Sequence, residues 1–224
     1  MDYSPLLIAL KTSITATFIT FVIGVYVAYL VKKLNKFKGI IDGILTLPLV
    51  LPPTVVGFFL LVFLGKNSVI GKYLALYDKS VVFTITAAVI ASTVVSLPLM
   101  YRTTRGAFEQ LDRDIIHVAK TLGLSEHKIF LKIMLPNSFP SIMAGTVLAF
   151  VRALGEFGAT IMVAGNIPGK TQTMSVAVYT AVQAGNRPLA YKWVLVMGVI
   201  SFVSMIIMNR FERNQFGKVR KAVN

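Results

Sequence analysis

Long uncharged stretches run through this chain of 224 residues and limit what it can fold into. A helix needs about 20 predominantly apolar residues to cross the hydrocarbon core of a bilayer. Five stretches meet or approach that length, the fourth with two charges inside it: 12–31, 43–65, 80–101, 141–165 and 193–209. The mean hydropathy of +0.73 also exceeds what is typical of a soluble domain. We therefore expect an all-α polytopic membrane protein with about five transmembrane helices.

A further uncharged block, 171–186, is slightly short of the span minimum of about 17 residues. We expect it to form a re-entrant or surface-lying helix instead of a sixth span. Neither a linker nor a low-complexity tract divides the sequence, and we detect no inverted repeat of the kind found in secondary transporters. The expectation is a single transmembrane domain, 1–224.

The net charge of +14 would suit a nucleic-acid partner, so the distribution of the cations matters. Fifteen lysines and arginines fall in three segments, 32–38, 102–139 and 210–221. These segments alternate along the chain with 66–79 and 166–192, which hold six. An excess of cations on alternating sides is the positive-inside pattern of cytoplasmic loops. We expect the C-terminus and 102–139 in the cytoplasm, the N-terminus outside, and no nucleic-acid partner.

The segment 106–137 differs from its surroundings because it is amphipathic and lies between two apolar stretches. Its first half carries apolar residues at helical spacing: Leu111, Ile115, Val118, Ala119 and Leu122. Gly123 can end that helix in a left-handed conformation, and Ser125 can cap a second one. Pro136 is expected to end the second helix. We predict two short helices joined by a tight turn at Gly123.

Two alternatives concern the use of this segment. A DNA-reading helix-turn-helix has a similar outline, but four acidic and four basic residues between Phe108 and Leu135 cannot provide a phosphate-neutralising surface. A loop that only packs against its own spans fits the pattern as well as a partner-binding loop does. The periodicity alone leaves these last two interpretations open.

The spacing within this segment resembles the EAA loop of ABC-importer permeases, whose pattern is E-A-A, three residues, G, nine residues, I-x-L-P. Here His117-Val118-Ala119 is followed at the same spacing by Gly123 and by Ile133-Met134-Leu135-Pro136. His117 and Val118 depart from the family glutamate and alanine. In that family the loop is the coupling helix, which docks into a cleft on the cytoplasmic ATPase subunit. The resemblance implies a small-residue contact surface at Ala119 and Gly123. It assigns coupling to Ala119, Leu122, Gly123, Leu124, Ser125 and Pro136.

Three more stretches, 47–57, 96–109 and 148–174, resemble the molybdate permease subunits of bacterial importers. The resemblance covers the chain from about Gly39 to Gly185, and permeases for sulfate and tungstate share part of it. It implies a type I ABC-importer permease fold in the cell membrane. The implied function is to move molybdate, or a similar tetrahedral oxyanion, into the cytoplasm by alternating access.

The same resemblance implies a set of partners. These are a dimeric cytoplasmic ATPase, a second copy of the chain, an extracytoplasmic oxyanion-binding protein and the lipid bilayer. ATP and magnesium would be bound by the ATPase, so we expect no cofactor in this chain.

Two ionisable residues, Arg152 and Glu156, lie within the fourth apolar stretch. They are four residues apart, within pairing range on one face of a helix. Ionisable groups at that depth face the bundle interior or a wet cavity, where they either pair or act on a substrate. We place both residues in the translocation pathway, where Arg152 would attract the oxyanion and Glu156 would hold or release it. For Glu156 a purely structural ion pair is the favoured alternative.

Three prolines, Pro48, Pro52 and Pro53, interrupt the second apolar stretch. Each removes a backbone donor, so the helix must kink or unwind. Broken helices at membrane depth mark substrate pathways in transporters, and we place Pro52 and Pro53 in the pathway, with a purely structural kink as the alternative. Small residues such as Gly145 and Ala149 favour close helix packing. Because five spans are too few to enclose a route, we expect a homodimer.

Enzymatic activity is not expected from this sequence. Residues 164–171 satisfy the loose phosphate-loop pattern [AG]-x4-G-K-[ST], but they follow a membrane stretch instead of a β-strand. The chain has no cysteine, and its two histidines both lie in 106–137. The energy for transport must then come from another chain. The alternative from another class is a carrier or channel that acts without ATP.

Overall fold

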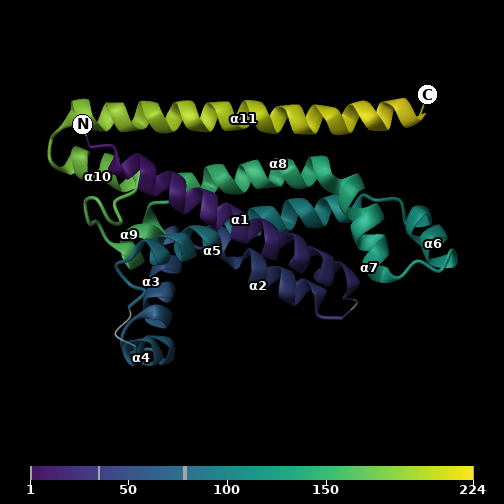
Figure 1. Ribbon diagram of the computed structural model, residues 1–224, viewed down its shortest axis with the longest axis horizontal. Coiled ribbons are helices and arrows are strands. Elements are labelled where there is room, and N and C mark those ends of the chain that lie inside the picture. The colour runs from purple at the N-terminus through teal and green to yellow at the C-terminus, as the bar shows by residue number, and fades with distance from the viewer. Residues whose placement is uncertain (1, 35, 78–79, 224) are drawn as a thin grey trace.

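The computed structural model describes residues 2–34, 36–77 and 80–223, and side chains as far as Phe211 except that of Ala75. Within these residues every regular element is a helix, as expected (Figure 1). The α-helices are α1 (Ser4–Lys33), α2 (Lys38–Val50), α3 (Pro53–Leu64), α4 (Val69–Ala75), α5 (Ile85–Glu109), α6 (Arg113–Thr121), α7 (Glu126–Ile129), α8 (Leu135–Leu154), α9 (Gly158–Ala164), α10 (Met174–Gln183) and α11 (Arg187–Val223). A π-helical turn, Phe130–Met134, joins α7 to α8.

In the described part of the chain, four helical segments are long and apolar enough to cross a membrane. They are α1, α5, the run Glu126–Leu154 and the first part of α11, Arg187–Phe211. The bent pair of α2 and α3 raises the count to five if it is taken as one span. Helix α10 has 10 residues, too few to span, so it matches the expected short helix.

The second predicted span, 43–65, is not one straight helix. Helices α2 and α3 meet at 110°, with Leu51 and Pro52 in extended conformations between them. A residue that precedes proline avoids the helical region, and proline fits the first turn of a new helix. The predicted interruption is therefore confirmed at Pro52 and Pro53, whereas Pro48 remains inside α2.

The fourth predicted span, 141–165, was wrong as a continuous helix. Helix α8 ends at Leu154 and α9 begins only at Gly158. The Glu156 carboxylate, in the break, accepts a hydrogen bond from the backbone N–H of Ala159 at 2.7 Å. Because this capping satisfies a donor in the first turn of α9, a new helix can begin there.

Pro136 does not end the second short helix, contrary to the prediction. The chain continues from α7 through the π-helical turn into α8, and Pro136 lies in the first turn of α8. In the widened turn the N–H of Leu135 bonds to the carbonyl of Phe130, five residues earlier. A proline directly after such a turn is accommodated without breaking the helix.

Small residues bring the long helices together, as predicted. Helix α5 packs against both α1 and α8. A Cβ added to Gly145 of α8 would lie 2.9 Å from the Cβ of Thr103 in α5, and Ala149 is fully buried. This close packing lies within the chain.

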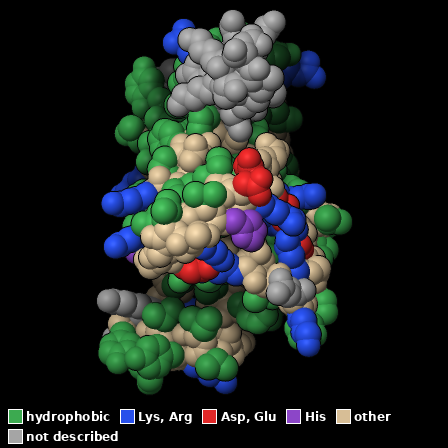
Figure 2. Space-filling view, turned by 90° about the vertical axis from the view of Figure 1, so that its right-hand side faces the viewer, with side chains coloured by type: hydrophobic (Ala, Val, Ile, Leu, Met, Phe, Trp, Pro, Cys, Tyr) green, Lys and Arg blue, Asp and Glu red, His purple; other side chains and the backbone are tan. Residues whose placement is uncertain are grey.

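The three basic segments lie at one end of the bundle. Figure 1 shows the C-terminal end of α1, the α6–α7 region and the C-terminal part of α11 at the same end. Figure 2 looks onto that end, where Lys and Arg side chains gather with a few acidic side chains and a histidine. The shared position of these three segments agrees with the expectation, from the alternation of cation-rich and cation-poor segments, that they lie on one side of the membrane. Four C-terminal cations have side chains outside the described set: Arg213, Lys218, Arg220 and Lys221.

Candidate functional site

The turn between α6 and α7 is built on Gly123, which has a φ of +75°. Its N–H donates to the carbonyl of Lys120 at 3.0 Å, and the N–H of Leu124 donates to the carbonyl of Ala119 at 3.1 Å. These two bonds form a Schellman motif, which satisfies the last carbonyls of α6. Ser125 occupies the N-cap position of α7, although its side chain makes no capping bond. The predicted glycine turn is confirmed.

The α6–α7 loop, residues 111–135, is packed against the rest of the bundle. Ala119, Ile129 and Met134 belong to the same buried cluster as Phe108 of α5. The rings of Tyr29 in α1 and Phe130 lie 4.2 Å apart. These contacts fix the loop on the ends of α1 and α5.

Ion pairs complete the attachment. Glu126 pairs with Lys33 of α1 at 2.6 Å and with Lys120 of α6 at 3.0 Å. Lys33 also lies 4.2 Å from the centre of the Tyr29 ring. Exposed pairs of this kind contribute little stability each, so the buried cluster carries most of the attachment.

The apolar residues of α6 divide between two faces. Ala119 is 3% exposed and packs in the buried cluster, so its side chain does not belong to the exposed face of the helix. Ile115, Val118 and Leu122 are exposed, Leu122 at 75%. Their spacing places these three on one side of the helix. Gly123 is exposed too, and a Cβ built there meets no atom within 4 Å.

The two helix breaks lie side by side. A Cβ added to Gly158, at the start of α9, would lie 3.0 Å from the Cβ of Pro53. One turn further along α3, a Cβ on Gly57 would lie 2.8 Å from the Cα of Ala159. The structure thus brings together the proline break and the Arg152–Glu156 break, which are about 100 residues apart in sequence. Both segments carry a local sequence signal, but no local signal indicates that they are in contact.

Arg152 and Glu156 form the ion pair that their spacing suggested. Arg152 Nη1 lies 2.6 Å from Glu156 Oε2, and the other carboxylate oxygen is bonded to Ala159. The Glu156 side chain is 1% exposed and that of Arg152 is 28% exposed. Ser175 of α10 donates to the Glu156 carbonyl at 2.7 Å. Both carboxylate oxygens and the carbonyl of Glu156 thus have hydrogen-bond partners within the fold. Arg152 has further N–H donors besides the one that bonds to Glu156.

Comparison with known proteins identifies the family of this chain. Residues 20–219 match the family described as binding-protein-dependent transport system inner membrane component. The chain belongs to that family. It is 41% identical over 93% of its length to YvgM of Bacillus subtilis (strain 168), a protein provisionally named as a molybdenum transport system permease, and covers 92% of it. It is 38% identical to the molybdenum transport system permease protein ModB of Escherichia coli (strain K12), with 97% of each chain covered. The sulfate transport system permease protein CysT of the same strain is 30% identical over 94% of this chain and 76% of its own.

Solved structures share the fold of this inner membrane component at low sequence identity. The inward-facing MetNI methionine ABC transporter matches with a TM-score of 0.73 at 15% identity, over 94% of both chains. A bacterial ABC transporter that imports alginate matches with a TM-score of 0.72 at 16% identity, over 96% of this chain and 80% of its own. The fold is therefore that of type I ABC-importer permeases, as expected.

One feature of this inner membrane component was missed in the sequence. Helix α2 has no buried residue, yet a polar network ties it to α5. Asp42 of α2 accepts from Tyr101 and pairs with Arg105, both in α5. Glu109 of α5 pairs with Lys38 of α2 at 2.8 Å and with Arg105 at 3.0 Å. The partners that join α2 to α5 are 59 to 71 residues apart, so only the fold brings them together.

The phosphate-loop-like segment, 164–171, has no phosphate-loop structure. It follows α9, a helix, and the residues that the structure describes contain no strand. Thr171 is buried, with its hydroxyl accepting from the N–H of Ile167 at 3.1 Å. A phosphate-binding loop instead connects a strand to a helix whose N-terminus faces the phosphate.

Proposed function

We propose that this chain is the membrane-spanning permease subunit of an ABC importer for molybdate. In this proposal a separate cytoplasmic ATPase dimer binds ATP and magnesium and drives alternating access. An extracytoplasmic binding protein delivers the oxyanion to two copies of the permease. The chain itself binds no cofactor and hydrolyses nothing.

The observation that carries the transport proposal is the exposed apolar face of α6, formed by Ile115, Val118 and Leu122. This face lies on a loop that a buried cluster fixes to α1 and α5. An exposed apolar face on a firmly held helix suits docking into a groove of a partner protein. Movement of that partner would be passed to the long helices through the same cluster. We assign the partner's contact to this face and to Gly123, Leu124 and Ser125.

The helix breaks suit a pathway that two copies share. Pro53 lies against the start of α9 at Gly158. The Arg152–Glu156 pair comes immediately before that start, at the end of α8 and in the break. Backbone that is not helical at membrane depth persists where it is buried in protein or lines a cavity. We place Arg152 in the pathway, where its remaining donors can contact an oxyanion, and give Glu156 the role of holding Arg152 and the start of α9.

The relatives support molybdate over other oxyanions. The proteins named for molybdenum transport are 38% and 41% identical to this chain, and the protein named for sulfate transport is 30% identical. Sulfate or tungstate remains the alternative substrate, because all three are tetrahedral dianions. A carrier that works without ATP is the less favoured alternative.

The positive-inside rule supports an orientation with the α6–α7 loop and the C-terminus in the cytoplasm and the N-terminus outside. The binding protein would then dock at the opposite end of the bundle, which holds α10 and residues 165–173 (Figure 1). This agrees with a relative in fold, the bacterial alginate ABC transporter, which has been solved in complex with a periplasmic protein (TM-score 0.68, 15% identity).

Reconstitution into vesicles tests the proposal. The permease is inserted alone, with its ATPase, and with the ATPase plus loaded binding protein, and uptake of molybdate is measured with and without ATP. We expect uptake only in the last arrangement with ATP present. Uptake by the permease alone would refute the proposal in favour of a carrier. Equal uptake of sulfate in the complete system would refute the assignment of molybdate.

A further inference from the structure

Two lysines line a cavity of about 540 Å³ at the end of the bundle opposite the α6–α7 loop. Its walls are the first turns of α1, the start of α5 and residues 169–171. Lys11 and Lys170 contribute the charge, and no acidic residue among those that the structure describes lines the cavity. Among the described residues neither lysine forms an ion pair. The cavity therefore carries a positive charge that the described part of the chain does not balance.

The start of α5 adds to this preference for an anion. Thr84 and Ile85, in the wall of the cavity, open a helix of 25 residues, whose N-terminal end favours negative charge. Phe83 holds this end in place: its N–H donates to the carbonyl of Val163 at 2.9 Å. A Cβ on Gly165 would lie 2.9 Å from the Phe83 ring, so this contact is close.

The cavity opens on a face of α1 that is exposed along most of a membrane-spanning helix. Leu7, Lys11, Ile14 and Phe18 are all exposed, Phe18 at 69%, and follow one another at helical spacing. Because α1 is long and apolar enough to span, this face is available to the hydrocarbon of a bilayer. Lys11 lies in the second turn of α1, near the end of the candidate span, where it would be close to lipid headgroups.

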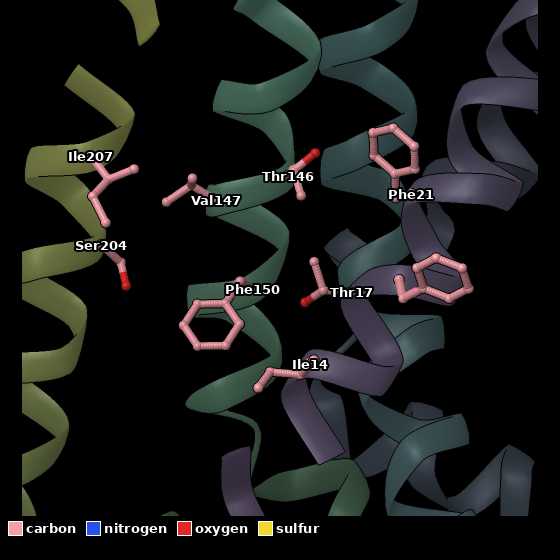
Figure 3. A pocket seen from close by; sticks show the side chains of 9 residues that line it. Ile14, Thr17, Phe21, Thr146, Val147, Phe150, Ser204 and Ile207 are labelled. Atoms are coloured by element: carbon pink, nitrogen blue, oxygen red, sulfur yellow. The ribbon is translucent and has the colours of Figure 1, made fainter. Parts of the chain in front are cut away.

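Ile14 and Phe18 also line an apolar groove of about 430 Å³ between α1, α8 and α11. Figure 3 shows side chains of these three helices around it, with Phe150 and Val147 of α8 directed toward α11. The groove's three hydroxyl groups are turned to their own helices. Each donates to a carbonyl four residues earlier, at 2.6 Å for Thr17 and 2.8 Å for Thr146 and Ser204. The lining thus offers mainly hydrocarbon to whatever fills it.

We propose that the cavity and the groove together bind one anionic glycerophospholipid. Its phosphate lies between Lys11 and Lys170, and an acyl chain follows Ile14 and Phe18 into the groove. Lys11 and Phe18 are seven residues apart, about 10 Å along a helix, so one lipid can reach both. Residues at the two helix breaks line neither feature, which separates this site from the proposed pathway. A free oxyanion would use the cavity but would gain nothing from the groove.

Lipid titration of the purified full chain in detergent, followed by native mass spectrometry, tests the site. The probes are phosphatidylglycerol, phosphatidylcholine and inorganic phosphate. Near an anionic lipid surface each lysine contributes roughly a five-fold factor in affinity, so Lys11→Gln with Lys170→Gln should bind phosphatidylglycerol about twenty-five-fold more weakly. The control, Lys66→Gln with Lys72→Gln, removes the same charge outside the cavity and should bind as the native chain does. Val147→Phe, which fills the groove, should weaken lipid binding without changing the charge.

Three results would overturn the proposal. The first is equal phosphatidylglycerol binding by the two double variants. The second is displacement of the lipid by inorganic phosphate at millimolar concentration, which would assign the cavity to a free oxyanion. The third is unchanged lipid binding together with weaker binding of the extracytoplasmic protein by the cavity variant, which would make the two lysines a protein contact.

Discussion

Removing the arginine of the Arg152–Glu156 pair should destabilise the protein more than neutralising its glutamate. The Glu156 side chain is 1% exposed, so Arg152→Met leaves a buried carboxylate that only Ala159 stabilises. Breaking a buried ion pair in this way costs about 3–5 kcal/mol. Glu156→Gln retains an acceptor for the Ala159 N–H, and Arg152, 28% exposed, can still reach water. Losing the charged hydrogen bond then costs about 1.5–3 kcal/mol.

The double variant, Arg152→Met with Glu156→Gln, separates pairing from simple loss of contacts. Because it leaves no buried charge, it should be more stable than Arg152→Met alone. The coupling free energy should therefore exceed the cost of Glu156→Gln by itself, about 1.5–3 kcal/mol. The assay is unfolding of the detergent-purified chain and its three variants. If the costs of the two single changes sum to the cost of the double variant within about 0.5 kcal/mol, the argument is refuted.

The same double variant tests the pathway. It should insert and fold, so a loss of molybdate uptake in vesicles with ATPase and binding protein would be due to the missing guanidinium. We expect uptake to fall by at least tenfold. If uptake by the double variant equals that of the native permease, Arg152 has only a structural role.

Three further predictions follow from the contacts. Gly123→Leu and Gly123→Ala both place a side chain at a left-handed backbone position, which costs about 1–2 kcal/mol, but only leucine adds bulk at the α6–α7 turn. ATPase activity should uncouple from uptake in the leucine variant alone. Equal coupling in both variants would contradict docking at Gly123. Gly57→Ala should destabilise the chain by about 1–3 kcal/mol because the added Cβ meets Ala159, whereas Gly43→Ala, whose Cβ meets no atom within 4 Å, should be neutral or stabilising. Equal unfolding temperatures of the two variants would disprove the close contact between α3 and α9. Asp42→Asn should loosen α2, seen as faster amide hydrogen exchange in Lys38–Val50, and unchanged exchange would show that the polar network does not hold this helix.

Features set by local chemistry were predictable from the sequence. The long apolar stretches indicated the spans, and the consecutive prolines at 52 and 53 indicated the break between α2 and α3. Gly123 indicated the tight turn, because glycine adopts a positive φ without strain. Each of these depends on a residue and its immediate neighbours.

Features set by contacts between distant segments were not predictable. No proline lies near the break between α8 and α9; it depends on capping by Glu156 and on the contact of Gly158 with α3. Apolar residues occur on two faces of α6, and only packing against α1 and α5 decides that Ala119 is buried and Leu122 exposed. The network of Asp42 joins residues about 60 positions apart, for which no local pattern exists.

Contact between the α6–α7 loop and the ATPase is the central claim, and disulfide crosslinking tests it directly. The chain has no native cysteine, so Leu122→Cys provides a single thiol at the most exposed apolar position of α6. A cysteine in the permease-facing cleft of the ATPase is paired with it, and Lys66→Cys at the other end of the bundle is the control. The account predicts a crosslink for Leu122→Cys whose yield changes with ATP, and none for Lys66→Cys. A crosslink from position 66, or none from position 122, would contradict it.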